Sequence, residues 1–327
     1  MEVRTTMDTI NTKKTSRFKQ SSFAELARLV WQDKLSRIAV FVIGIVVFMA
    51  LLSFFWTPHD PFTNQVALRR QGPSWSSWFG TDLVGRDLFS RVMYASRITV
   101  ILTFITIVAG GLPFSIGLGV FPIFYSKKAD FAVQRTGEAL GALPALFLIL
   151  ILRAGLRPMY DNFVYTLGPA GRWAIKTGMA DLFVIFLIIS FISWIGPARM
   201  FRAQVLQMRE SAFVERARML GASKFRIVSR HILPQLYTYI VHSALLMIVG
   251  VVGTELALSF LGIGIQLPYP SFGGLLAESA NSRMLSSAAH LLIFPGLVIF
   301  SYIFAFLFLE LRLTLLTSSE HEREVLQ

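Results

Sequence analysis

The polar loop over residues 199–235 has the residue types and spacing expected of a charged surface that contacts a partner. It carries eight Lys or Arg residues against two carboxylates, Glu210 and Glu215. Apolar residues within it recur at i, i+4 and i+7, which predicts a short helix over 211–220 with one apolar face. That face is formed by Phe213, Ala217 and Leu220.

A glycine and a serine divide this loop into two short helices. Gly221 is the expected residue after the first helix, because glycine readily takes the left-handed conformation. Ser223 can cap a second helix over 224–232, and Pro234 suits the start of the next helix. The resulting helix–glycine–helix knob, ringed by arginines, suits insertion into a groove on a soluble partner or contact with anionic headgroups. The pattern alone leaves both interpretations open.

Three ionisable residues lie inside long apolar runs, namely Glu138, Glu255 and His242. A charge at the centre of a membrane helix costs about 2.5–3.5 kcal/mol on insertion scales, so each should face the bundle interior or water. Glu138 and Glu255 are therefore candidates to line or gate a translocation path, or are carboxylates satisfied by neighbouring groups. An ion pathway through Glu138, Glu255 and His242, as in a secondary transporter or channel, is the alternative function.

A third polar group precedes the second long apolar run. Asp82, Arg86 and Asp87 stand beside two glycines in the segment 57–97. They can form a docking surface for a soluble protein, or an internal salt-bridged turn that orients the helix after them. Exposed ion pairs contribute only about 0–1 kcal/mol, so the second interpretation requires a partly buried network.

Motifs for nucleotide binding and hydrolysis are absent from the sequence. It lacks G-x-x-x-x-G-K-[ST], G-x-S-x-G and H-E-x-x-H, its five histidines are scattered, and it has no cysteine. We therefore expect no catalytic site, no metal site and no cofactor in this chain, and no enzymatic activity of its own.

The composition indicates which elements must position these residues. Of the 327 residues, 54% are hydrophobic and 15% are charged, whereas soluble domains average about 25% charged residues. Six runs approach the roughly 20 apolar residues that a membrane-spanning helix needs. They are Ile38–Trp56, Ile98–Phe124, Phe131–Leu152, Leu182–Ile195, Leu236–Phe260 and Ala288–Leu309. The sequence therefore predicts an all-α polytopic membrane protein with six transmembrane helices.

The net charge of +12 is explained by membrane orientation. Six spans place both termini on one side, and the segments on that side carry 21 Lys or Arg residues, against 10 on the other. Because positive charge concentrates on the cytoplasmic side, both termini are expected to be cytoplasmic. The charge then implies contact with membrane lipid and no nucleic-acid partner.

The chain divides accordingly into five regions. We expect a cytoplasmic N-terminal tail with an interfacial amphipathic helix, a first transmembrane helix, an external segment, a five-helix core that includes the loop 199–235, and a cytoplasmic C-terminal tail. Their ranges are 1–37, 38–56, 57–97, 98–312 and 313–327.

The polar loop resembles the EAA loop of ABC-importer permease subunits. The resemblance rests on Glu215-Arg216-Ala217, on Gly221 four residues later, and on the ending Ile232-Leu233-Pro234. Arg216 stands where the family motif has its first alanine, and the ending lacks one intervening residue.

Two further blocks are similar to the peptide/nickel permeases of the DppC/OppC type. One is Phe79–Arg97, which precedes the second span, and the other runs from Glu255 to Gly264 and on through Pro268–Gly274. Together the resemblance covers roughly 24–309. The segment 153–181 is longer than the family usually has, and 310–327 lacks the family's usual ending.

This resemblance implies a MetI-like permease fold and a binding-protein-dependent importer, driven by ATP, in a bacterial inner membrane. It implies a homologous second permease subunit, two cytosolic ATPase subunits that hydrolyse ATP, and an external substrate-binding protein. The 211–234 loop would couple ATP hydrolysis to alternating access, with Glu215, Ala217 and Gly221 as its central residues. Similar permeases serve oligopeptides, dipeptides, nickel chelates, glutathione and some sugars.

Overall fold

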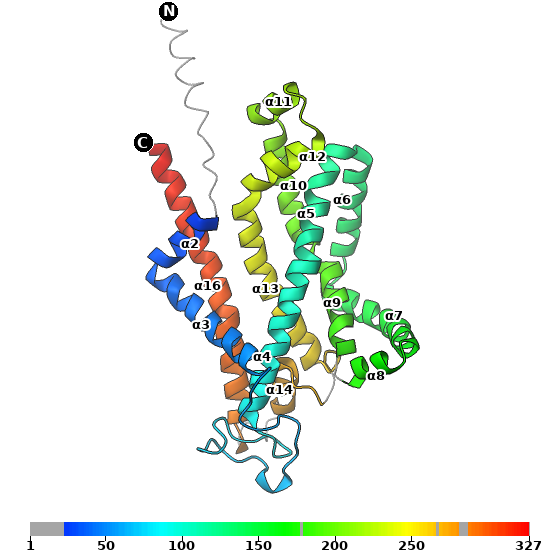
Figure 1. The fold of residues 1–327 in the computed structure, drawn as a ribbon, viewed down its shortest axis with the longest axis vertical. Coiled ribbons are helices and arrows are strands. Elements are labelled where there is room, and N and C mark those ends of the chain that lie inside the picture. Colours follow the sequence, from blue (N-terminus) through cyan, green and yellow to red (C-terminus); the bar gives the residue numbers. More distant parts are fainter. Residues whose placement is uncertain (1–22, 177–178, 266–267, 281–286, 327) are drawn as a thin grey trace, which may run out of the picture.

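The structure, a computed structural model, describes residues 23–176, 179–265, 268–280 and 287–326. The described part is mostly helical and elongated (Figure 1). Its first half comprises α2 (Phe23–Gln32), α3 (Lys34–Leu52), η1 (Val66–Leu68), α4 (Leu88–Ile105), η2 (Thr106–Gly111), α5 (Leu112–Tyr125), α6 (Lys127–Gly141) and α7 (Ala145–Thr166). Its second half comprises α8 (Pro169–Lys176), α9 (Met179–Ser193), α10 (Ile195–Arg209), α11 (Ala212–Met219), α12 (Lys224–Ile227), η3 (Val228–Ile232), η4 (Leu233–Leu236), α13 (Tyr237–Phe260), α14 (Phe272–Ser279) and α16 (His290–Leu326).

Five helical segments in the described ranges are long and apolar enough to cross a membrane. They are Lys34–Leu52, Leu88–Tyr125, Leu182–Arg209, Lys224–Phe260 and His290–Thr317. Each overlaps one of the apolar runs identified in the sequence, so those five expected spans are confirmed as helices of sufficient length.

The third apolar run, Phe131–Leu152, is not one straight helix. It is divided between α6 and α7, which together are long and apolar enough to cross a membrane but meet at an angle of 98°. The break falls at Pro144, which occupies the N-cap position of α7. Proline has no N–H to continue a helix and disfavours helical geometry in the residue before it, which accounts for the break.

The two ends of the bundle carry different elements. In Figure 1, α11 lies at one end, with the C-terminal end of α16 and α2 on the same half of the bundle, while α14 and the loop between α3 and α4 lie at the other end. The expected C-terminal tail, 313–327, continues α16 as helix to Leu326. The helix of the second span also begins earlier than expected, at Leu88 within the segment 57–97, because Asp87 caps it.

The start of α3 is fixed against α16 by one ion pair. Asp33 caps α3 by accepting a hydrogen bond from the amide of Ser36 at 2.8 Å. The guanidinium of Arg312 donates to both carboxylate oxygens, at 2.6 and 3.1 Å. Hydrogen bonds from Arg312 and Ser36 hold the pKa of the Asp33 carboxyl well below its usual range.

Leu26 and Leu29 of the amphipathic helix α2 are buried in the same core as α3 and α16.

Two further large apolar cores lie beside this one, in addition to a small cluster of Trp194, Ile195 and Ala198. The first joins α4, α7, α9 and α13 and is centred on Ile98, Leu102, Ile185, Ile188 and Val251. The second joins α5, α10, α11, α12, η3 and η4 at the end of the bundle that carries α11, and is centred on Val120, Phe201, Val205, Val214 and Ile232. We refer to this second group as the α11-end core. It places the 199–235 loop on the membrane-spanning helices.

Close contact between α5 and α10 supports the α11-end core and can be tested. A Cβ added at Gly119 would lie 2.6 Å from the carbonyl oxygen of Ala198 and 3.0 Å from its Cα. We expect Gly119→Ala to force the two helices apart and to destabilise the fold by about 1–3 kcal/mol. Thermal unfolding of the purified chain in detergent measures the loss. Gly117→Ala is the matched control, because nothing lies within 4 Å of a Cβ at Gly117; equal unfolding temperatures for both variants would contradict the close contact.

Candidate functional site

The first short helix of the loop ends as the sequence predicts. Gly221 follows α11 with a φ of 77°, in the left-handed region. The amide of Ala222 donates to the carbonyl of Ala217 at 3.0 Å, and the amide of Gly221 donates to that of Arg218 at 2.9 Å. This pair of bonds is a Schellman motif, which satisfies the carbonyls at the end of a helix. The turn therefore requires a residue that tolerates the left-handed conformation, and Gly221 supplies it.

The second short helix leads directly into the next span. The hydroxyl of Ser223 accepts a hydrogen bond from the amide of Arg226 at 3.3 Å, so the predicted cap is present. The helix expected over 224–232 is α12 followed by the π-helical turn η3. The connection to α13 is built from Ile232, Leu233 and Pro234. Because the side chain of Ile232 is fully buried, this connection is anchored in the α11-end core.

The buried face of α11 differs from the expected one. Val214 and Ala217 are 0% and 7% exposed and belong to the α11-end core, while Phe213 packs against it partly buried. Leu220, expected on this face, is 87% exposed. The chain turns at Gly221, so Leu220 lies at the tip of the knob instead of continuing the helical face. Val214 takes its place because it precedes Ala217 by three residues on the same face.

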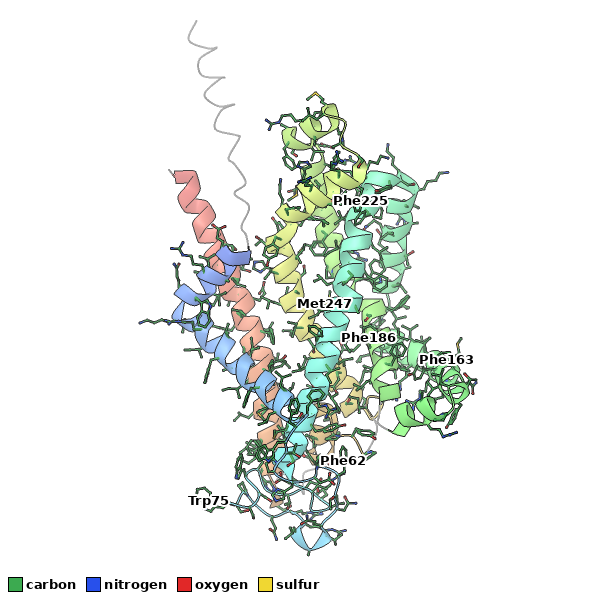
Figure 2. The ribbon with its side chains drawn as sticks, in the orientation of Figure 1. Phe62, Trp75, Phe163, Phe186, Phe225 and Met247 are labelled. Carbon is green, nitrogen blue, oxygen red and sulfur yellow. The ribbon has the colours of Figure 1, made fainter. Side chains whose placement is uncertain are left out.

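Charged side chains surround a depression beside α11. It has a volume of about 570 Å³ and is lined by Ile123, Phe124, Arg209, Glu210, Glu215, Arg218, Ala222, Lys224 and Ile227. Glu215 and Arg216 are both exposed. The guanidinium of Arg216 donates to the carbonyl of Ala212 at 3.2 Å, so it lies along its own helix. Phe225, labelled in Figure 2, contacts α5, where its ring lies 6.3 Å from that of Phe121.

Glu255 is the one predicted intramembrane carboxylate that the structure buries completely. Its Oε1 accepts a hydrogen bond from the hydroxyl of Ser259 at 2.8 Å, while its Oε2 has no hydrogen-bond partner among the described residues. Ser259 in turn accepts from the amide of Ile265 at 3.3 Å. Ser271 caps α14 through the amide of Gly274 at 3.2 Å. Through Ser259, Glu255 is therefore linked to the turn after α13 that contains Ile265.

The three residues of the alternative ion pathway lie in separate surroundings. Glu138 is exposed on α6 and pairs with Arg135 at 2.7 Å. His242 lies on α13 beside Glu310 of α16, with Nδ1 3.4 Å from Oε1. On α13, His242 and Glu255 are 13 residues apart, or about 20 Å along the helix axis. The structure does not bring Glu138, Glu255 and His242 together.

Asp82 is the centre of a buried ionic network at the end of the bundle opposite α11. It accepts hydrogen bonds from the amides of Val84 and Arg86, both at 2.9 Å, and from the guanidinium groups of Arg86 and Arg91. Arg91, fully buried in α4, also pairs with Glu278 of α14 at 2.8 Å. Burial raises the pKa of the Asp82 carboxyl, but the charge of Arg91 and the hydrogen bonds outweigh it, so the pKa lies below its ordinary value.

These contacts match the interpretation of Asp82, Arg86 and Asp87 as an internal salt-bridged turn that orients the following helix, and they contradict the docking-surface interpretation. Asp82 and Asp87 are only 2% and 6% exposed. Asp87 caps α4 by accepting a hydrogen bond from the amide of Ser90 at 2.8 Å. Both carboxylates point into the protein, where they fix the start of α4, and a soluble partner could not reach them.

Two members of this network were missed in the sequence. Arg91 stands in the block 79–97, seven residues before the apolar run Ile98–Phe124, and an arginine so close to a membrane-spanning run is a usable signal of a buried ion pair. Glu278 follows Arg91 by 187 residues, and nothing local to either residue indicates that they meet.

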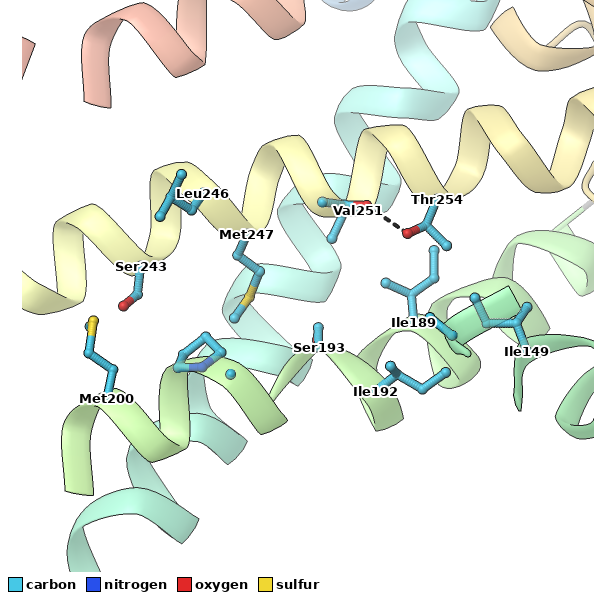
Figure 3. Close-up of a pocket in the computed structure, with 14 residues that line it drawn as sticks. Ile149, Ile189, Ile192, Ser193, Met200, Ser243, Leu246, Met247, Val251 and Thr254 are labelled. Atoms are coloured by element: carbon cyan, nitrogen blue, oxygen red, sulfur yellow. Dashed lines mark hydrogen bonds between the residues drawn. The ribbon is translucent and has the colours of Figure 1, made fainter. Parts of the chain in front are cut away.

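A second hollow, also missed in the sequence, lies between α7, α9, α10 and α13. It has a volume of about 440 Å³, and Figure 3 shows Met247 and Val251 of α13 facing Ile189 and Ile192 of α9 across it. Three hydroxyls interrupt its apolar lining, those of Ser193, Ser243 and Thr254. That of Thr254 donates to the carbonyl of Gly250 at 2.7 Å. Glu255, next to Thr254, does not line it.

The sequence of the chain matches one described protein family. Residues 111–316 match the family described as "Binding-protein-dependent transport system inner membrane component". This range runs from the end of η2 to the end of the fifth membrane-spanning segment, and it includes α11 and Gly221.

Curated proteins from several bacteria are similar over most of their length. The dipeptide transport system permease protein DppC of Bacillus subtilis (strain 168) is 29% identical over 281 residues, which are 85% of this chain and 80% of DppC. The glutathione transport system permease protein GsiD of Pectobacterium atrosepticum is 30% identical over 285 residues, 85% of this chain and 86% of GsiD. The oligopeptide transport system permease protein OppC of Bacillus subtilis is 29% identical over 248 residues, 75% of this chain and 73% of OppC.

The Asp82 network predicts a specific dependence of stability on pH. At neutral pH we expect Asp82→Asn to lower the thermal unfolding temperature, because an amide carries no charge to balance Arg91. The folded pKa of Asp82 lies below the unfolded value of about 3.9, so the stabilisation is complete above that value and is lost as the pH falls. The difference between natural chain and variant should therefore narrow below about pH 4.

Unfolding in detergent from about pH 7 to about pH 3 measures this difference. Glu210→Gln is the control, because the Glu210 side chain is 78% exposed. A difference for Asp82→Asn that stays constant over the whole pH range would contradict the predicted titration.

Proposed function

The chain belongs to the family of inner membrane components of binding-protein-dependent transport systems, and we propose that it couples ATP hydrolysis by two cytosolic ATPase subunits to the import of peptides. It is a permease subunit and not itself an enzyme. The relatives described above are named for dipeptides, glutathione and oligopeptides. The proposed solutes are therefore short peptides or peptide-like molecules.

The observation that carries the proposed coupling is the construction of α11. On one side, Val214 and Ala217 are buried in the α11-end core with residues of α5, α10 and η3. At its tip, Met219 and Leu220 are 73% and 87% exposed. Exposed apolar side chains on a projecting knob suit a groove on a soluble partner. Because α11 shares its core with three membrane-spanning segments, a movement of the knob would displace those segments as well.

The proposed partner at the knob is a cytosolic ATPase subunit. Arg209, Arg218 and Lys224 line the depression beside α11 together with Glu210 and Glu215, so polar contacts would adjoin the apolar tip. In this arrangement the α11 end of the bundle is cytoplasmic. Both α2 and the C-terminal end of α16 lie on the α11 half of the bundle (Figure 1), which agrees with the distribution of Lys and Arg along the chain.

The remaining partners follow from the same proposal. A homologous second permease subunit would complete the solute path, and an external binding protein would deliver solute at the end that carries α14. We place this chain's contribution to the path along the hollow between α7, α9, α10 and α13. Its three hydroxyls can exchange hydrogen bonds with peptide groups, and its lining carries no charged residue.

The turn at Gly221 gives the first test of the coupling role. We expect Gly221→Pro to abolish transport and solute-stimulated ATP hydrolysis while the chain still inserts, because proline cannot adopt a φ of 77°. Uptake of a labelled peptide into proteoliposomes that contain the whole complex measures the loss. Gly221→Asn is the matched variant that should keep most of the activity, since asparagine tolerates the left-handed conformation. Unchanged uptake in Gly221→Pro would contradict the coupling role.

The exposed tip gives the second test. We expect Leu220→Asp to reduce copurification of the ATPase subunits, because a carboxylate would replace an apolar contact at the interface. Trp75→Asp is the control, since Trp75 is 98% exposed but lies in the loop between α3 and α4 (Figure 2). If both variants retain the ATPase subunits equally, the ATPase subunits do not bind at the knob.

A further inference from the structure

The helix α7 lies across the bundle instead of along it. It makes an angle of 98° with α6, and in Figure 1 it lies beside α9, toward the end of the bundle opposite α11. Gly168, with a φ of 61°, ends it. α8 then folds back so closely that a Cβ at Gly171 would lie 1.7 Å from the carbonyl oxygen of Val164. This crosswise helix includes part of the segment 153–181, the segment that is longer than the resembled permease family usually has.

One face of α7 packs on the bundle. Leu148, Ile149 and Val164 are at most 7% exposed. Leu152, Leu156 and Tyr160 pack partly buried against the core formed with α9 and α13. The ring of Tyr160 stacks on that of Phe183 of α9, with centroids 5.4 Å apart. These contacts fix which side of α7 faces outward.

The outward face of α7 carries large apolar side chains without protein neighbours to cover them. Phe147, Ile151, Met159 and Phe163 are 63%, 65%, 70% and 59% exposed, and they are spaced by four or eight residues. Gly155, the position between them, has no atom within 4 Å of an added Cβ. Figure 2 shows Phe163 on the outer side of α7. In water such a row would be strongly unfavourable.

The charged residues of α7 occupy a separate strip along the helix. The guanidinium of Arg157 donates to both oxygens of Asp161, at 3.0 and 2.9 Å. Arg153 donates to the carbonyl of Gly264 at 3.1 Å. The strip consists of residues at four-residue intervals, Arg153, Arg157 and Asp161. Each position in it is two residues C-terminal to a position of the apolar row, so the strip lies on a different side of the helix. A helix with an apolar face and a charged strip suits the boundary between lipid and water.

We propose that α7 lies in the plane of the membrane, at the lipid–water boundary on the side opposite α11. Phe147, Ile151, Met159 and Phe163 contact phospholipid acyl chains, while the strip of Arg153, Arg157 and Asp161 lies toward the headgroups. The occupant is lipid because α9, on which α7 packs, belongs to a membrane-spanning segment with exposed apolar side chains of its own. They include Phe183, Leu187 and Phe191. This placement needs only a membrane-spanning chain and does not rest on the proposed transport function.

A fluorescent label on the outward face tests the depth of α7. The chain has no cysteine, so Met159→Cys or Phe163→Cys introduces a single thiol into it. The same labelling of the complex that contains the natural chain measures any label on the other subunits. The full chain, copurified with its associated subunits, is labelled with bimane and placed in nanodiscs. Their phospholipids are brominated either near the headgroup or near the methyl end of the acyl chain. We expect loss of most emission with the shallow bromines, a smaller loss with the deep ones, and little quenching by aqueous iodide.

Two control positions calibrate the depths. Phe41→Cys lies near the middle of α3, with Phe41 69% exposed, and should be quenched most by the deep bromines. Ser76→Cys lies on the exposed loop between α3 and α4 and should be quenched mainly by iodide. A label on α7 that behaves like Ser76→Cys would overturn the proposal. Protection from every quencher would also overturn the proposal, because a protein partner would then cover the face. Quenching mainly by the deep bromines, as expected for Phe41→Cys, would overturn it as well.

Discussion

The burial of Val214 and Ala217 in the α11-end core is the interaction on which the proposed coupling depends. α11 has only eight residues, and a helix of that length is not stable alone in water. It exists because the same core also holds residues of α5, α10 and η3. Since protein interiors are closely packed, α11 cannot move without a displacement of those helices. The knob is therefore a part of the bundle that reaches into solution, and not a separate appendage.

Most of the fold could be predicted from the sequence because membrane-spanning helices need long apolar runs, and such runs are a local property. The bend between α6 and α7 was missed for a specific reason. The run Phe131–Leu152 meets the requirement of apolarity, but Pro144 interrupts the helix within it. Hydropathy averages over such a break. The proline was the available signal, and the direction that the chain takes after it depends on packing against α9.

The candidate site divides in the same way. Gly221 and Ser223 were predictable because a Schellman motif and a helix cap involve only neighbouring residues. Leu220 was misplaced because helical periodicity was extended past the residue where the helix ends. The docking interpretation of Asp82 failed because its burial depends on Arg91 and α14. Contacts between residues distant in the sequence leave no periodic pattern.

The ionic network at the start of α4 also has a consequence for sequence divergence. Its guanidinium groups, on Arg86 and Arg91, are matched by the carboxylates of Asp82 and Glu278. The group is therefore electrically neutral, and neutrality limits the desolvation cost of holding it inside the protein. Loss of one member leaves a buried charge without its counterion. Among related chains these positions should accordingly covary, with oppositely charged residues gained or lost in pairs.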